Sequence, residues 1–149
     1  KDETSKYTDL MADGRSRMFS LTMDPKSVIT NPSFGQVMQG PGLYQISGIA
    51  WSGHGRIRRV EVSADAGRSW AEAALADLVA DKATTRFRMP WRWSGGPSVL
   101  MSRAIDDKGN IQVSRAQLLE RMGNNFNYHN SAITCWSVSE KGEIAHVYA

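Results

Sequence analysis

The stretch with the strongest claim to chemistry is WSGHGR, residues 51–56. Its two glycines leave room for backbone N–H groups to approach an anion, and Arg56 places a permanent positive charge beside them. The stretch lacks the spacing of a phosphate-binding loop, and no helix is predicted to begin after it. Taken alone, the residues favour a tight β-hairpin connection whose glycines adopt positive φ angles.

Neither the cysteine nor the histidines indicate a metal site. Cys135 is the only cysteine, which excludes an internal disulfide and a cysteine-based zinc cluster. It lies beside Trp136 in an apolar run, which predicts a small core residue rather than a nucleophile. His54, His129 and His146 are far apart and lack the spacing of metal ligands.

Three acidic residues, of the type that acid–base chemistry uses, lie in turn contexts. Asp65, Asp106 and Asp107 each precede a glycine within a few positions, which is typical of turns. No serine lies in the glycine-flanked turn that a hydrolase nucleophile occupies. The carboxylates are therefore predicted to shape turns.

Five tryptophans are many for 149 residues. Trp91 and Trp93 flank Arg92, and rings combined with a guanidinium suit a surface that binds a sugar or a protein. Trp51 and Trp70 are predicted to fill the core, which leaves residues 91–93 as the candidate binding surface.

Short runs of strand character, separated by turn residues, predict an all-β fold. The alternation is clearest in residues 57–65, where Val60 and Val62 share one face and Arg59 and Glu61 the other. Such runs at intervals of 8–15 residues are typical of a two-sheet antiparallel β-sandwich. The predicted runs are 17–30, 40–53, 57–65, 68–75, 84–93, 95–107, 131–138 and 143–149.

One short helix is predicted over residues 114–123. Ser114 is the predicted N-cap, Gln117 completes a capping box and Gly123 ends the helix. Residues 1–16 are polar and are predicted to form an extended N-terminal arm over a neighbouring surface. Residues 17–149 are predicted to form one domain.

Composition excludes several classes of protein. The chain is 41% apolar and 22% charged, as in a globular domain, and no run approaches the roughly 18 apolar residues of a membrane helix. A net charge of +3 without a basic tail gives no support for nucleic-acid binding. The sequence begins with neither a methionine nor a signal peptide, so we expect it to be a piece of a longer protein.

Residues 48–75 carry a longer pattern: Ala50 to Arg56, then Arg59 to Ser63, then Asp65, Gly67 and Trp70. This pattern resembles the C-terminal dimerisation domain of the sulfite oxidase family of molybdenum enzymes. SRAIDDKGNIQ at 102–112 and the terminal HVYA continue the resemblance, which covers about residues 17–149. Within the family, the two ends of the chain look most like the sulfane dehydrogenases of the thiosulfate-oxidising Sox system.

The resemblance implies an immunoglobulin-like antiparallel β-sandwich that serves as the homodimerisation domain of a periplasmic oxidoreductase. It implies that molybdenum-molybdopterin and its cysteine ligand belong to a preceding N-terminal domain, so this chain would hold no cofactor and not turn over substrate alone. It also implies partners: that molybdenum domain, a c-type cytochrome subunit and a sulfur-carrier protein. Arg56 matches the family arginine that makes the substrate-anion pocket positive, and His54 stands where many relatives have glycine.

Three functions remain open at this point. The chain is a dimerisation module of such an enzyme, or a stand-alone immunoglobulin-like module that binds a carbohydrate or protein through residues 91–93, or an autonomous enzyme. For Arg56, the alternative to a pocket role is an arginine that braces its loop or an interface.

Overall fold

A computed structural model describes residues 8–10, 13–18, 22–122 and 129–148. Strands dominate these residues, and the one helix among them is α2, Arg115–Met122. The strands are β1 Thr8–Leu10, β2 Ser16–Met18, β3 Lys26–Asn31, β4 Gly42–Trp51, β5 Ile57–Ser63, β6 Ala71–Leu75, β7 Thr85–Trp93, β8 Ser98–Asp106, β9 Cys135–Val138 and β10 Ile144–Val147. The prediction of an all-β sandwich is confirmed, and the described residues contain one short helix.

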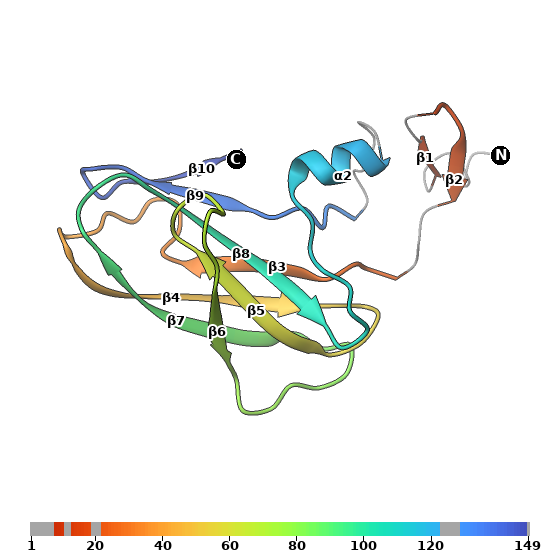
Figure 1. The fold of residues 1–149 in the computed structure, drawn as a ribbon, viewed down its shortest axis with the longest axis horizontal. Helices are drawn as coiled ribbons and strands as arrows, with labels where there is room; N and C mark the ends of the chain where they lie inside the picture. The colour runs from red at the N-terminus through yellow and green to blue at the C-terminus, as the bar shows by residue number, and fades with distance from the viewer. Residues whose placement is uncertain (1–7, 11–12, 19–21, 123–128, 149) are drawn as a thin grey trace.

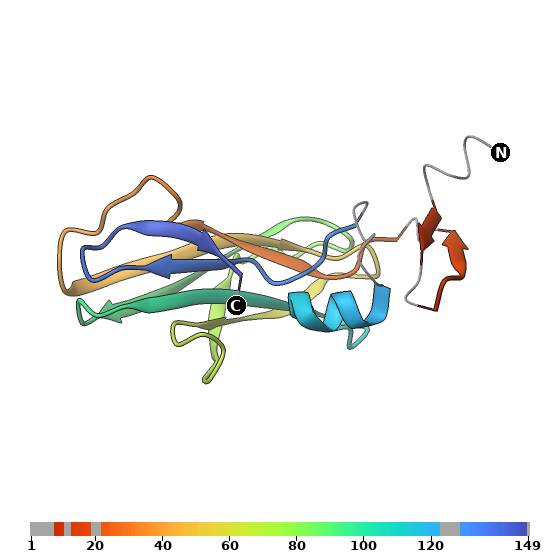
Figure 2. The same ribbon diagram turned by 90° about the horizontal axis from the view of Figure 1, so that it is seen from above.

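Eight strands pair antiparallel in the order β10-β9-β8-β5-β6-β7-β4-β3 and fold over into two layers. Strand β6 belongs to both layers, because it pairs with β5 over Ala71–Ala73 and with β7 over Ala74 and Leu75. Figures 1 and 2 show the two layers, with α2 and the β1–β2 pair at one end of the molecule. The chain enters β5 from β4 at that same end.

Buried polar contacts close the sandwich where β3 lies against β8. The Ser27 hydroxyl donates to the Ser102 hydroxyl at 2.9 Å, and the Gln112 side-chain oxygen accepts from the Ser27 and Ala104 N–H groups at 2.8 and 3.1 Å. Gln112 therefore supplies these two N–H groups with the acceptor that a paired strand would supply.

The core follows the predicted alternation. Val60 and Val62 are fully buried, while Arg59 and Glu61 point outward and pair at 3.0 Å. Cys135 is 2% exposed, which confirms it as a core residue. The buried apolar cluster comprises Ile29, Met38, Ile46, Ala50, Ile57, Val60, Val62, Ala73, Phe87, Trp93, Leu100, Ala104, Val138 and Ile144.

The prediction that Trp51 and Trp70 fill the core while residues 91–93 form a surface is wrong. Trp93 is 2% exposed and belongs to the core, whereas Trp51 and Trp70 are only half-buried and lie outside the core cluster. Trp70 lies under the Arg103 guanidinium at 4.2 Å and donates its ring N–H to the Gly67 carbonyl at 3.0 Å. Local polar partners hold it at the surface, and a period-2 pattern does not reveal such partners.

The helix begins as predicted. The Ser114 N–H donates to the Gln117 side-chain oxygen at 2.9 Å, and the Gln117 N–H donates to the Ser114 hydroxyl at 3.2 Å. This reciprocal pair is a capping box. Leu118 packs the helix onto the domain, and Gly123, the predicted stop, lies outside the described residues.

The predicted arm over residues 1–16 is described only in part. Thr8–Leu10 pairs antiparallel with Ser16–Met18, so this short ladder spans the predicted boundary at residue 16. That residues 1–16 cover a neighbouring surface stays a prediction.

Candidate functional site

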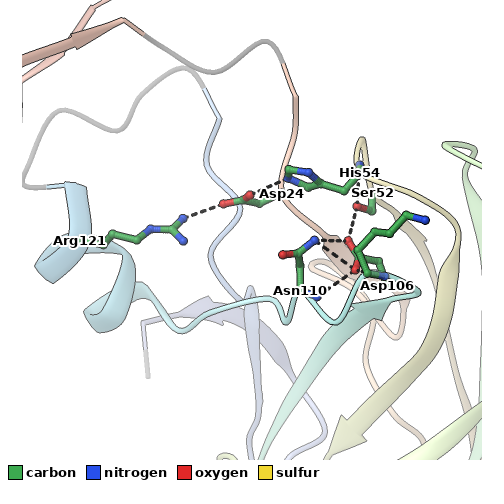
Figure 3. Close-up of polar contacts among 7 residues, drawn as sticks. Asp24, Ser52, His54, Asp106, Asn110 and Arg121 are labelled. Atoms are coloured by element: carbon green, nitrogen blue, oxygen red, sulfur yellow. Dashed lines mark hydrogen bonds and ion pairs between the residues drawn. The ribbon is translucent and has the colours of Figure 1, made fainter.

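The site is built around Asp106, which ends β8 beneath the 52–56 connection. Its buried carboxylate accepts hydrogen bonds from the Lys108 and Asn110 N–H groups at 3.0 and 2.9 Å and from the Ser52 hydroxyl at 2.8 Å. Burial raises the pKa of Asp106, but the bonds from Asn110, Ser52 and Lys108 outweigh burial, so the pKa lies below its usual value. The charged carboxylate thus ties the connection to the 106–110 turn (Figure 3).

The connection 52–56 is not a β-hairpin, which corrects the prediction from its glycines. It carries the chain from β4, which pairs with β3 and β7, to β5, which pairs with β6 and β8. Gly53 and Gly55 are also absent from the described glycines with positive φ. A β-carbon at Gly53 would lie 2.8 Å from the Met23 nitrogen, and one at Gly55 would clash with the Asp107 carboxylate. Glycine is required at Gly53 for close approach to the Met23 backbone rather than for an unusual φ, whereas at Gly55 the flexible Asp107 side chain would have to move.

His54 joins the connection to two other segments. Its Nε2 lies 3.1 Å from Asp24 Oδ1, and the other Asp24 oxygen accepts from Arg121 of α2 at 2.7 Å (Figure 3). Burial alone would raise the pKa of Asp24. The hydrogen bonds and charges of Arg121 and His54 lower it by more, so the pKa of Asp24 lies below its usual value. Asp24 is therefore held as a carboxylate between helix and loop.

Arg56 lies at the surface, close to the same turn. Its Nε is 3.3 Å from Asp107 Oδ2, and its side chain is 62% exposed. Lys108 Nζ lies 4.0 Å from the other oxygen of Asp107. Arg56 and Lys108 offset the negative charges of Asp107 and Asp106, and the exposed guanidinium retains donors for an anion. The Asp107 contact also fits the bracing alternative, so both roles predicted for Arg56 stay predictions.

The other acidic candidates are turn residues, as predicted. Asp65 accepts from the Ser69 N–H and hydroxyl at 2.9 and 2.6 Å and from the Ser63 hydroxyl at 2.7 Å. The bonds from Ser69, followed by that from Ser63, lower the pKa of Asp65 to about 2. Such a carboxylate stabilises a turn and is a poor proton donor or acceptor near neutral pH.

The site contains four residues that sequence reasoning did not single out: Ser52, Asp24, Asn110 and Arg121. Asn110 stood within the turn signal DDKGN, and Ser52 within the glycine stretch, but neither pattern indicates that the two converge on Asp106. Asp24 and Arg121 are 97 positions apart, so their pairing depends on the tertiary fold.

The described part of the chain contains no group of three or more histidine, cysteine, aspartate or glutamate side chains that could hold a metal ion. His54, His129 and His146 are not brought together in such a group. Among the described residues, no helix is both long and apolar enough to cross a membrane.

Comparison with known proteins gives consistent matches. Mitochondrial sulfite oxidase of Mus musculus is 35% identical over 97 residues, which cover 58% of this chain and 17% of that protein. Nitrate reductase (NADPH) of Neurospora crassa is 32% identical over 80 residues, which cover 50% of this chain and 8% of that protein. The crystal structure of the sulfane dehydrogenase SoxCD from Paracoccus pantotrophus superposes with a TM-score of 0.94 and 46% identity over 98% of this chain.

The chain spans less than a fifth of those two curated relatives and 38% of the matched sulfane dehydrogenase chain. The model of one family, the Mo-co oxidoreductase dimerisation domain, matches residues 17–136, which are most of the sequence. The chain therefore belongs to the dimerisation-domain family of the molybdenum-cofactor oxidoreductases.

Proposed function

We propose that this chain is the homodimerisation domain of a molybdenum-dependent sulfane dehydrogenase that oxidises sulfur in thiosulfate metabolism. The similarity to the SoxCD structure carries the proposal, because its 46% identity extends over 98% of the chain. The match to mouse sulfite oxidase is 35% and covers 58% of the chain. Sulfite dehydrogenation is therefore the second choice for the parent reaction.

The molybdenum cofactor belongs to another part of the parent in this proposal. Cys135, the only cysteine, is buried in β9 and pairs with Met101 of β8, so it does not fit the role of an accessible thiolate ligand. Molybdenum analysis of the purified chain tests this assignment. We expect far less than one metal per chain, and stoichiometric molybdenum would contradict it.

Arg56 contributes to the anion pocket of the parent in this proposal. An exposed guanidinium beside Lys108 attracts an anionic sulfur substrate, and a charge-assisted contact of this kind contributes about 1–3 kcal/mol. We expect Arg56→Met in the full-length enzyme to raise KM for its sulfur substrate by about tenfold or more. Arg58→Met, which removes an exposed arginine of β5, is the matched control. Unchanged kinetics in Arg56→Met would leave Arg56 with the bracing role alone.

The remaining parts of the proposal concern location and partners. A sulfane dehydrogenase of the Sox type would act in the periplasm, with a c-type cytochrome subunit and a sulfur-carrier protein. Fractionation of the source cells, followed by affinity purification of the tagged parent protein, tests both. Recovery from the cytoplasm, or without a haem-containing partner, would contradict this part.

A stand-alone binding module is the weaker alternative. It requires Trp91, Arg92 and Trp93 to form a common exposed surface. Trp93 is buried in the core, and Trp91 packs against the core. The surface that this alternative requires therefore lacks the Trp93 ring.

A further inference from the structure

Strand β7 presents a row of arginines on the outer face of its layer. Arg86, Arg88 and Arg92 are exposed, whereas the alternate residues Thr85, Phe87 and Trp93 are buried. Residues two apart on a strand project from the same face, so the three guanidinium groups line one side of the sheet. Among the described residues, none of the three arginine side chains makes an ion pair or hydrogen bond.

A groove runs beside this row. Its first part encloses about 640 Å³ and is lined by Arg86, Arg88, Ser47 and Asp77, among others. Its second part is lined by Leu43, Pro90 and Met89, among others. Gln45, Ala74 and Arg88 line both parts, so the two parts form one trough across β4, β6 and β7.

The trough is long enough for a short peptide in extended conformation. From Leu43 to Ile49 along β4 it spans six residue steps, or about 20 Å at 3.3–3.4 Å per residue. Arg86 and Arg88 stand two residues apart, opposite Ile49 and Ser47 in the register. Alternate side chains of a peptide in extended conformation have the same repeat, so carboxylates at alternating positions match the two arginines.

We propose that this trough binds an extended acidic segment of a partner protein. Carboxylates at alternating positions pair with Arg86 and Arg88, and an apolar side chain packs beside Leu43 and Pro90. Arginine suits this role because its planar guanidinium holds a carboxylate through two parallel hydrogen bonds. The proposal goes beyond dimerisation and does not depend on the parent's substrate.

Charge argues against a second copy of this chain as the occupant. A two-fold interface brings the same patch of both copies together. Each copy would bring Arg86, Arg88 and Arg92, with Asp77 as the one acidic residue lining the described trough. Like charges would face one another, which favours an acidic partner and places self-association on another surface.

The test uses fluorescence polarisation with the whole chain. The ligand is a fluorescein-labelled peptide of about seven residues with glutamate at alternating positions and leucine at one end. We expect Arg86→Gln combined with Arg88→Gln to weaken binding about tenfold, and added salt to weaken it further. Arg58→Gln combined with Arg68→Gln is the control, because both are exposed arginines outside the trough and the change of net charge is the same.

Three results would overturn the proposal. The first is equal loss of binding in both double variants, which would mean that net charge alone attracts the peptide. The second is equal binding of a peptide with glutamine in place of every glutamate. The third is a change in the dimer dissociation constant, by sedimentation, in the Arg86/Arg88 variant and not in the control, which would make a second copy the occupant.

Discussion

At the scale of single residues, the 52–56 connection owes its shape to close packing and to buried charge. Gly53 is a glycine because the Met23 backbone occupies the space that a β-carbon would need, and the Asp107 carboxylate lies in the corresponding space at Gly55. Asp106 anchors the connection through Ser52, and Asp24 joins His54 to Arg121. Residues 52–56, which resembled an anion-binding loop in sequence, therefore connect the two layers of the sandwich, and Arg56 is exposed at the end of this connection.

Gly48 is predicted to be indispensable to strand β4. A β-carbon there would overlap the Val28 carbonyl oxygen and the Phe87 ring. We expect Gly48→Ala to lower the free energy of unfolding by about 2–3 kcal/mol, because the core must shift to admit the methyl group. Gly96→Ala is the matched control, since nothing lies within 4 Å of its added β-carbon. Urea unfolding of both variants measures the difference, and equal stabilities would contradict the packing described for β4.

Asp106 is predicted to make the free energy of unfolding depend on pH in the acidic range. The pKa of Asp106 is lower in the folded chain than the ordinary aspartate value of about 3.9, so its stabilising effect is complete about one pH unit above that value and is lost as pH falls through the folded pKa. Asp106→Asn removes a buried acceptor of charge-assisted bonds, which costs about 2–3 kcal/mol near neutral pH. The difference in unfolding free energy between wild type and variant should shrink below pH 4.

Asp81→Asn, at an exposed position outside the described ion pairs, is the control for that experiment. A difference between wild type and Asp106→Asn that stays constant from pH 7 to pH 2 would mean that the charge on Asp106 does not hold the connection.

At the scale of elements, the strands and the helix were predictable because their signals are local. Alternation located β5, the turn residues located the β9–β10 hairpin, and Ser114 with Gln117 located the start of α2. The layer change between β4 and β5 was not predictable, because glycine-rich residues alone describe a hairpin equally well. The pairing of Asp24 with Arg121 and the burial of Trp93 instead of Trp70 likewise depend on contacts between distant segments.

The capping box is predicted to support α2 and, through it, Asp24. We expect Ser114→Ala to lower the free energy of unfolding by about 1 kcal/mol, because the Gln117 N–H loses its acceptor. Amide hydrogen exchange should accelerate in Arg115–Met122 first. Glu120→Ala, an exposed change in the same helix, is the control, and identical exchange in the two variants would contradict the role of the cap.

At the scale of the whole molecule, the described residues form a β-sandwich in which one end and one outer face differ in chemistry. One end gathers Asp106, Asp24, His54 and Arg56. The outer face of β4 and β7 carries the row of Arg86, Arg88 and Arg92, whose side chains make no ion pair among the described residues. Relatives named sulfite oxidase and nitrate reductase match the same domain, so the sandwich itself does not select a substrate. We therefore expect it to act through association and through the few side chains that it lends to a neighbouring domain.

Sedimentation velocity of the purified chain tests the central claim, homodimerisation, most directly. At tens of micromolar we expect a dimer in reversible exchange with monomer, and we expect the dimer to persist when Arg56 is replaced by methionine. A strict monomer over that concentration range would contradict the proposal that this domain carries the self-association of its parent.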